Sequence, residues 1–378
     1  MRPPRFIPCS DARPRALLAV AGLAVAGGLL AAVTLPGAGP SVAAASAASI
    51  GTRALTELLD SAATASGAAA APRPARNAIV AVSAAEVWAG PHRVKPVDRP
   101  AMQSPAHLLD WLHGMSFFQR SHLYQRLATQ VRYGEQVVVL ARRGTLSRIR
   151  IPDQTGGRYP TGIVGWIASR QLAAEPADWG AWRREATVTA RRAQLRGTAG
   201  GHLRTVALSY ATTLPVIQVS GSRVVVAAAG PLRAGSLPRS AVSIHAPDTA
   251  ALRPSGRQVV AQARRFLGLP YLWAGMTSWG FDCSGLASTV YSMLGIRLPR
   301  DAADQSLVGR SVPRRALRPG DLVYFSYNRK RSGIHHVAIY AGDGRVIQSP
   351  YTGARVDVMR LRGSYLNREY WGASRPLR

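Results

Sequence analysis

The C-terminal third of the chain, residues 249–378, places its helical patterns before a run of short strands. The stretch "RQVVAQARRFLGLPYLW" begins with apolar residues at helical spacing and breaks at Gly268 and Pro270. A second helical stretch, "CSGLASTVYSMLG", is followed by the β-rich segments "DLVYFSY", "HHVAIYAG", "RVIQSP" and "ARVDVMRL". Helices first and strands afterwards predict an α+β domain.

Cys283 stands at the start of the second helical stretch, and the only other cysteine among the 378 residues is Cys9. The thiolate is the reactive form of cysteine, and a helix N-terminus or a nearby imidazolium favours it. Asp282 is a suitable N-cap residue, and Leu286 and Val290 continue the helical spacing. The pattern predicts Cys283 as a nucleophile in the first turn of a helix. The alternative is a buried cysteine that packs as a small hydrophobic residue.

The segment "SGIHHVAIYAG" supplies two adjacent histidines at the start of a strand. Alternation places His336 and Ala338 on one face, and His335 and Val337 on the other. One histidine can therefore meet Cys283 as its base, and the other is expected to be a surface or hydrogen-bonded residue. Neighbouring strand residues cannot both face one metal ion, so a metal site at the two histidines is not predicted. A cysteine nucleophile with a histidine base needs no organic cofactor either, so no cofactor is predicted.

The turn "GDG" at 342–344 decides where Gln348 lies. A three-residue loop pairs Ala338 with Gln348 and puts Gln348 on the His336 face, as a diagonal neighbour. A two-residue Asp-Gly loop puts Gln348 on the opposite face. In the first case the amide oxygen of Gln348 can accept a hydrogen bond from the imidazole, which completes a Cys–His–Gln arrangement.

The N-terminal residues 1–48 have the order of a secretory signal peptide. A basic stretch precedes an apolar run at 16–33, and small residues with A-x-A spacing follow near 43–47. The apolar run is close to the length that spans a bilayer, so a retained signal anchor is the alternative. Residues 49–77 are rich in Ala, Ser and Pro and read as a linker. After cleavage, Cys283 would be the only cysteine left, which excludes a disulfide within the mature chain.

The charge balance, 48 basic against 19 acidic residues, gives a formal net charge of +29. Such a surface is either simply solvated or attracted to a polyanion. Export and the scattered positions of the basic residues argue against nucleic acid and favour an anionic cell envelope as the partner. We therefore expect a secreted or envelope-associated protein, with a membrane contact only if the N-terminal segment is retained.

Two β-rich blocks lie between the linker and the C-terminal domain. The first, residues 78–175, has short strands with a helical insertion at "PAHLLDWLHGMSFFQRSHLYQRLA", and the second spans residues 176–248. Many short strands at close spacing predict a small barrel or sandwich for each block. Both blocks resemble bacterial SH3-like domains, on strand spacing and on "GWIA" near the end of the first.

The motifs of residues 249–378 resemble those of the NlpC-type cell-wall cysteine peptidases, a papain-like group. They are "PYLWAG…FDCSGL", "LPRDAADQ", "PGDLVYF" and "HHVAIYAGDGRVI". The resemblance implies Cys283 as nucleophile and His336 as base, with Gln348 at a third position that is often His. It also implies that Tyr271, Asp282 and Ser284 line the pocket for the N-terminal part of a peptidoglycan stem peptide, and that the Tyr271 hydroxyl can lie near the oxyanion. Arg300 and Asp301 are expected to be loop scaffolding.

By the same resemblance, the chain is an exported endopeptidase that cleaves stem peptides between γ-D-glutamyl and a diamino acid. In a subgroup with two SH3-like domains, the first of them contacts the free amine of the peptide. The corresponding positions here look like Ala128 and Ile163, which weakens amine recognition. The alternatives are a non-catalytic peptidoglycan-binding protein with a degenerate peptidase domain, and an acyltransferase or amidase on the same scaffold.

Overall fold

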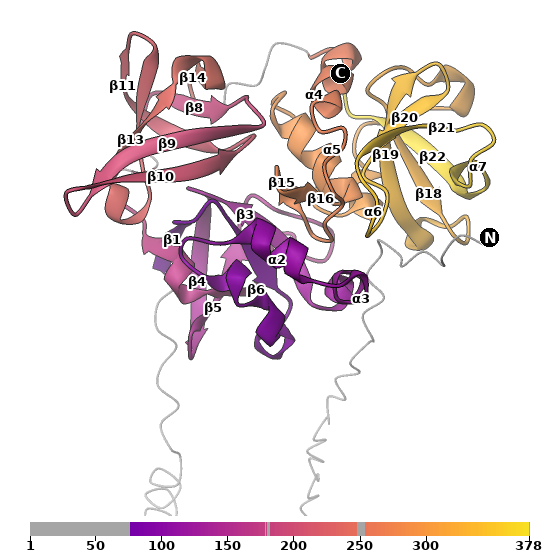
Figure 1. Ribbon diagram of the computed structural model, residues 1–378. Helices are drawn as coiled ribbons and strands as arrows, with labels where there is room; N and C mark the ends of the chain where they lie inside the picture. The colour runs from indigo at the N-terminus through magenta and orange to yellow at the C-terminus, as the bar shows by residue number, and fades with distance from the viewer. Residues whose placement is uncertain (1–75, 178, 180–181, 248–253, 378) are drawn as a thin grey trace, which may run out of the picture. The chain divides into compact units, whose positions relative to one another are not determined.

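The computed structural model describes residues 76–377 apart from 178, 180–181 and 248–253 (Figure 1). The predicted signal segment at 1–48, Cys9 and the linker up to residue 75 lie outside the described residues, as does most of the stretch where the third domain was predicted to begin. No helix within the described ranges is long and apolar enough to cross a bilayer.

The first block forms a seven-stranded antiparallel sheet with the strand order β3-β2-β6-β5-β4-β1-β7. Its strands are β1 (Arg76–Val80), β2 (Ala84–Trp88), β3 (Leu127–Arg132), β4 (Gln136–Arg143), β5 (Leu146–Ile151), β6 (Ile163–Ala168) and β7 (Leu172–Ala174). The expected helical insertion is present between β2 and β3. It comprises α2 (Leu108–Gly114), α3 (Phe117–Ser121) and the 3-10 helix η4 (His122–Gln125), preceded by the 3-10 helices η1 (Pro91–Arg93), η2 (Pro96–Asp98) and η3 (Pro100–Met102).

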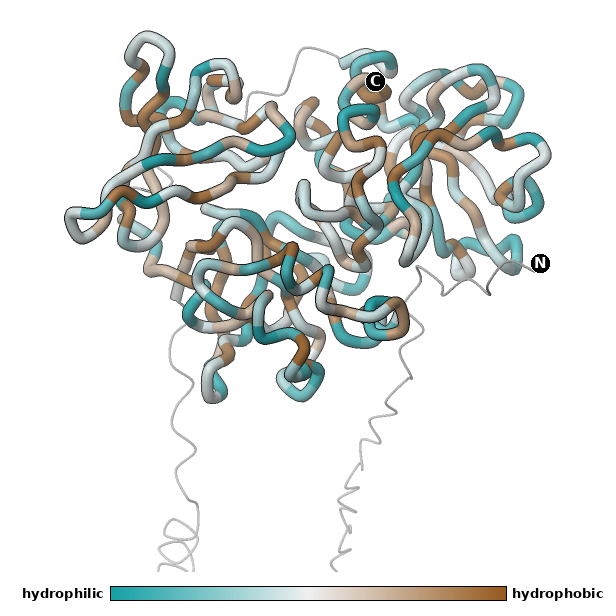
Figure 2. Tube along the Cα trace, viewed as in Figure 1, coloured by the Kyte–Doolittle hydropathy of each residue, from teal (hydrophilic) through white to brown (hydrophobic). Residues whose placement is uncertain are grey.

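The second block forms another seven-stranded antiparallel sheet, ordered β10-β9-β13-β12-β11-β8-β14. Its strands are β8 (Glu185–Val188), β9 (Arg192–Ala199), β10 (His202–Ser209), β11 (Thr213–Ser220), β12 (Arg223–Ala227), β13 (Ala234–Pro238) and β14 (Val242–His245). Along β9, Ala193 and Leu195 are buried while Arg192 and Arg196 are exposed. Figure 2 shows that hydrophilic and hydrophobic residues both occur along the strands of this block. In the described residues neither strand order closes on itself, so the two blocks are sheets without a closed barrel.

The described residues after the second block, 254–377, form a third unit, which is α+β as the sequence predicts. Its six-stranded antiparallel sheet has the order β17-β22-β18-β19-β20-β21. The strands are β17 (Arg310–Ser311), β18 (Leu322–Ser326), β19 (Ile334–Gly342), β20 (Arg345–Gln348), β21 (Asp357–Arg360) and β22 (Tyr370–Arg375), with a separate ribbon of β15 (Met276–Thr277) and β16 (Gly280–Phe281). The helices are α4 (Gly256–Arg264), α5 (Cys283–Ser292), α6 (Ala302–Gln305) and α7 (Leu366–Glu369).

The alternation of β19 separates two hydrophobic clusters. Val337 and Ile339 belong to the core that contains α4 and α5, while Ala338 packs in a second cluster with Phe325 and Val346. Helix α4 begins with a capping box, in which Ser255 accepts from the backbone of Gln258 and the Gln258 side chain accepts from the backbone of Ser255. Helices α4 and α5 pack on one face of the sheet through this core, and the N-terminus of α5 thereby lies close to the first residues of β19, among them His336.

Buried hydrogen bonds join the first block to the ribbon that precedes α5. The Gln130 side-chain oxygen accepts from the backbone N–H of Met276 at 2.9 Å and from the Thr277 hydroxyl at 2.8 Å. The Gln130 amide nitrogen donates to Oε1 of Glu86 at 2.7 Å. Burial raises the pKa of Glu86, the hydrogen bond from Gln130 opposes this shift and the charge of Asp98 adds to it, so that the pKa is about 8.

We predict that Glu86→Gln removes a pH dependence from the stability of the protein. Because the folded protein holds the Glu86 proton more tightly than the unfolded chain, the carboxyl stabilises the fold fully below about pH 4.5, and this contribution is lost as the pH rises to about 8. At about 1.4 kcal/mol per pH unit, the unfolding free energy should fall by on the order of 2 kcal/mol more in the wild type than in the variant between pH 6 and pH 8. Urea unfolding at both pH values measures this, and parallel pH profiles would contradict it.

Candidate active site

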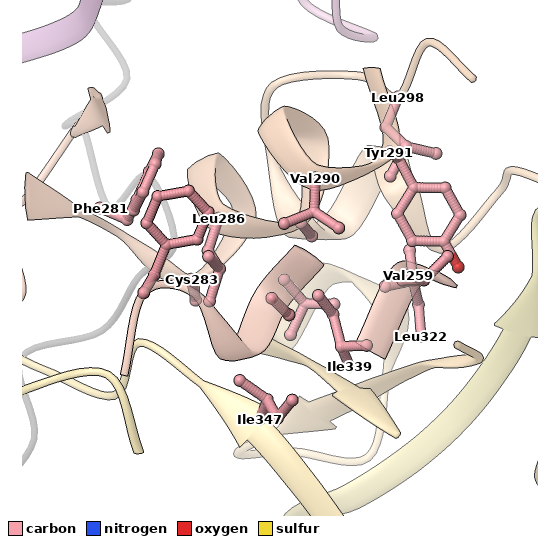
Figure 3. Close-up of a cluster of buried hydrophobic side chains, with 14 of the residues drawn as sticks. Val259, Phe281, Cys283, Leu286, Val290, Tyr291, Leu298, Leu322, Ile339 and Ile347 are labelled. Carbon is pink, nitrogen blue, oxygen red and sulfur yellow. The ribbon is translucent and has the colours of Figure 1, made fainter. Parts of the chain in front are cut away.

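Cys283 is the first residue of α5, and its side chain is buried, 2% exposed. Asp282 is the N-cap, as predicted, and its Oδ1 accepts from the backbone N–H of Gly285 at 2.6 Å. A Cβ on Gly285 would collide with the backbone oxygen of Gly275, so glycine allows α5 to pack directly on the preceding loop. Figure 3 shows Cys283 at one end of the buried cluster, beside Phe281.

His336 lies between Cys283 and Gln348. Its Nε2 is 2.8 Å from Oε1 of Gln348, and the ring also forms a hydrogen bond with the Cys283 side chain. Because Gln348 occupies Nε2, Nδ1 is the nitrogen left to take the thiol proton. The three side chains therefore form a continuous row, in which an amide oxygen orients an imidazole and the imidazole can deprotonate a thiol.

The β19–β20 turn and an adjacent bulge together place Gln348 in this row, a combination that neither of the two loops considered from the sequence includes. Asp343 and Gly344 both have positive φ, as in a type I′ two-residue turn, and Gly342 pairs with Arg345. A bulge at Ala341 then shifts the register by one residue. Tyr340 pairs with Val346 and Ile339 with Ile347, and continuing this register sets Ala338 opposite Gln348. Of the two loops considered, the structure has the two-residue Asp-Gly turn, but the bulge puts Gln348 on the face that the three-residue loop implied.

The surroundings of His336 favour its protonated form. Burial, the largest single influence, lowers the pKa of His336, whereas the hydrogen bond and charge of Cys283 raise it. Gln348 and the charge of Glu369 act in the same direction, so the pKa lies above its ordinary value. A raised imidazole pKa favours transfer of the thiol proton to His336, which yields a thiolate beside an imidazolium.

His335 is buried, so it does not lie at the surface, which was one of the two environments expected for the second histidine. Its ring stacks on Tyr327 with centroids 3.7 Å apart, and Nε2 lies 3.2 Å from a carboxylate oxygen of Glu369. Burial, aided by repulsion from His336, lowers the pKa of His335 to about 3. His335 is therefore neutral at physiological pH and a much weaker base than His336, which is the histidine in contact with Cys283.

Arg300 is a residue that the sequence interpretation missed, since it was expected to be loop scaffolding. Its guanidinium donates to both carboxylate oxygens of Asp282, at 2.6 and 3.2 Å, and to the Ser284 hydroxyl at 3.0 Å. It also donates to the hydroxyl of Thr129 in the first block at 3.0 Å. The side chain is buried, 3% exposed. Arg300 thus neutralises the carboxylate next to the nucleophile and ties the site to β3.

A cavity of about 430 Å³ is lined by residues of the first block and of the third unit. Of the three residues expected to hold the stem peptide, Asp282 and Ser284 line this cavity and Tyr271 does not. The lining residues are Leu127, Ala128, Gly157, Arg158, Tyr159, Ile163, Trp273, Ala274, Asp282, Ser284, Arg300, Asp301, Ala302, Ala303, Asp304, Ser332 and Ile334. Ala128 and Ile163, the two positions matched to amine recognition, both lie in this wall and carry no charge.

Residues 268–375 match the model of the NlpC/P60 family. A γ-D-glutamyl-L-lysine dipeptidyl-peptidase of Bacillus cereus is 30% identical over 305 residues, which are 80% of this chain and 91% of that protein. The chain belongs to the NlpC/P60 family. A Bacillus subtilis protein of the same description is 30% identical over 290 residues, covering 75% of this chain and 94% of its own length.

The likeness to these NlpC/P60 proteins extends to the structure. The crystal structure of an NlpC/P60 family protein from Bacillus cereus superposes with a TM-score of 0.76 at 30% identity, and it covers 80% of this chain and all of its own. The matched NlpC/P60 segment holds Cys283, His336 and Gln348 as well as Arg300. These matches cover 75–80% of the chain, so the likeness extends well beyond residues 268–375.

Proposed function

We propose that the chain is an exported cysteine endopeptidase that hydrolyses peptidoglycan stem peptides at the bond between γ-D-glutamyl and a diamino acid. The observation that carries the proposal is the hydrogen-bonded row of Cys283, His336 and Gln348, in which Cys283 lies between Asp282 and Ser284, two residues that line the cavity. The two Bacillus relatives, described as γ-D-glutamyl-L-lysine dipeptidyl-peptidases, support the choice of bond.

In the proposed reaction, the thiol proton of Cys283 passes to Nδ1 of His336 and the thiolate attacks the γ-carbonyl carbon of D-glutamate. The backbone N–H of Cys283 at the start of α5 would stabilise the oxyanion. When the C–N bond breaks, His336 returns the proton to the amine of the diamino acid, and a thioester remains. Water, deprotonated by His336, then attacks the thioester, and the proton returns to the sulfur.

We also propose that the two N-terminal sheets are SH3-like domains and that the segment at 1–48 directs export to the cell envelope. The strand spacing of both blocks supports the first statement, and the basic-apolar-small order supports the second. The domain boundaries 78–175, 176–248 and 249–378 stay predictions. An anionic envelope remains the expected partner of a chain with a net charge of +29.

A non-catalytic wall-binding role is the alternative, and Gln348, Ala128 and Ile163 are the residues that favour it. The Gln348 oxygen accepts from His336 at 2.8 Å, so this departure from the commonest residue keeps an acceptor where one is needed. This geometry supports the catalytic proposal at Gln348, one of the three positions that favour the alternative.

Mass spectrometry of the products from a defined stem peptide tests the proposal. Incubation with L-Ala–γ-D-Glu–diamino acid–D-Ala should release the L-Ala–D-Glu dipeptide and a dipeptide that begins with the diamino acid. Cleavage only at another bond would contradict the assigned specificity, and an intact substrate with every diamino acid tried would contradict the peptidase activity.

A further inference from the structure

The two ends of the Gln348 amide are not equivalent for catalysis. With Oε1 toward His336, as observed, the ring holds its proton on Nε2 and leaves Nδ1 as the acceptor for the thiol proton. If the amide turned over, its NH₂ group would require a lone pair on Nε2, and the ring proton would move to Nδ1. His336 could then no longer act as a base toward Cys283. A glutamine at this position therefore works only if something fixes its orientation.

The groups around the amide nitrogen of Gln348 are hydrogen-bond acceptors. Sδ of Met359 lies 3.5 Å from it, and the side chains of Asp357 and Tyr365 both form hydrogen bonds with Gln348. Asp357 is the direct cross-strand partner of Gln348 in the β20–β21 pair, so the two side chains share one face of the sheet. A tyrosine hydroxyl can donate as well as accept, but an ionised carboxylate only accepts. Asp357 is thus the group that most strongly excludes the reversed amide.

The Asp357 carboxylate has few polar contacts other than Gln348. Its Oδ1 is buried with no hydrogen-bond partner, and in the described part of the chain it takes part in no salt bridge with Arg or Lys. Burial raises the pKa of Asp357, while Gln348 and the charge of His336 pull it back. A carboxylate kept in such a place costs stability, and what it contacts is the residue that orients the base.

We propose that Asp357 is a positioning residue, whose carboxylate holds the Gln348 amide with its oxygen toward His336. The tautomer of His336 is fixed in this way, and with it the ability of Nδ1 to take the proton of Cys283. This inference rests on the proposed function, and it adds a fourth member to the row of side chains at the site.

A double-mutant cycle in the full-length protein tests the inference. Asp357→Leu in the wild-type background should lower kcat on the order of 10- to 100-fold, with KM changed less than about threefold, because the base is misoriented while the cavity is intact. Gln348→Glu gives position 348 two equivalent acceptor oxygens, so orientation no longer matters. In the Gln348→Glu background, the Asp357→Leu substitution should change kcat by less than about threefold, because the glutamate needs no group to orient it. A small change is still allowed, because the substitution also removes one of two neighbouring carboxylates.

Alkylation of Cys283 by iodoacetamide at pH 6 gives a second readout that needs no substrate. We expect Asp357→Leu to slow it about tenfold in the wild-type background and hardly at all in the Gln348→Glu background. Thermal unfolding midpoints monitor folding of all four proteins. Equal losses in both backgrounds would indicate a merely structural role and overturn the inference, as would an Asp357→Leu protein within twofold of the wild type. If the wild type cleaves no stem peptide yet alkylation shows the expected pattern, the proposed function fails and the positioning role stands.

Discussion

Cys283→Ala is expected to lower hydrolysis of a γ-D-glutamyl–diamino acid peptide by at least about 10³-fold. The expectation follows from the row of hydrogen bonds, in which only the sulfur can form a covalent bond with the substrate. Cys283 is also the only cysteine in the described residues. Loss of the nucleophile should therefore leave only the binding energy and the oxyanion contacts to accelerate the reaction.

The Cys283→Ala variant should remain folded, because the cap of α5 is formed by Asp282 and not by the thiol. Its unfolding free energy should lie within about 1–2 kcal/mol of the wild type, as for removal of one small buried group. Ser292→Ala, at the other end of α5, is the matched control, since that hydroxyl only donates to the backbone oxygen of Thr289. If the Cys283→Ala protein hydrolyses the peptide at or near the wild-type rate, the assignment of Cys283 as the nucleophile is contradicted.

Arg300→Met is expected to produce the largest loss of stability, about 3–5 kcal/mol, together with a severe loss of activity. Removing the guanidinium leaves the Asp282 carboxylate buried without a countercharge, only 4% exposed. The same unpaired negative charge stands next to Cys283 and opposes formation of the thiolate. The hydrogen bond from Arg300 to Thr129 of the first block is lost as well.

The double variant Arg300→Met/Asp282→Asn separates charge from packing. An asparagine at 282 can still cap α5, since its side-chain oxygen accepts as the carboxylate does, but it carries no charge. Denaturant unfolding should therefore show the double variant to be more stable than Arg300→Met alone by at least about 1 kcal/mol. If the two variants are equally unstable, the ion pair is not what Arg300 contributes.

The α+β order and the place of Cys283 could be predicted because the signals are local. The N-cap at Asp282 and the helical spacing after it lie within one short segment. The final strand of the sheet, β22, was not expected, because "YWGASR" is only half-buried and contains a glycine, which weakens the strand pattern. Tertiary pairing with β18 and β17 forms it nevertheless.

The other differences between the predicted and the observed site arise from tertiary contacts or from local irregularities that the sequence pattern does not reveal. Arg300 contacts Thr129, which is 171 positions earlier, and no local pattern reveals such a contact. His335 and His336 look alike in the sequence, and only the folded structure, which buries His335 and sets His336 against Cys283, shows which of them is the weaker base. The bulge at Ala341 is a one-residue irregularity that turn chemistry alone does not indicate.

The rate of Cys283 alkylation by iodoacetamide, followed as a function of pH together with the loss of activity, tests the central claim most directly. We predict that the wild-type rate at pH 5.5 stays within a few-fold of the rate at pH 7.5, because His336 holds the thiol proton, whereas His336→Ala should show the steep fall of an ordinary thiol, about tenfold per pH unit. Peptide mapping should place the adduct on Cys283, and hydrolysis should disappear in proportion to it. A wild-type thiol that titrates like the variant, or full hydrolytic activity after complete modification of Cys283, would contradict the account.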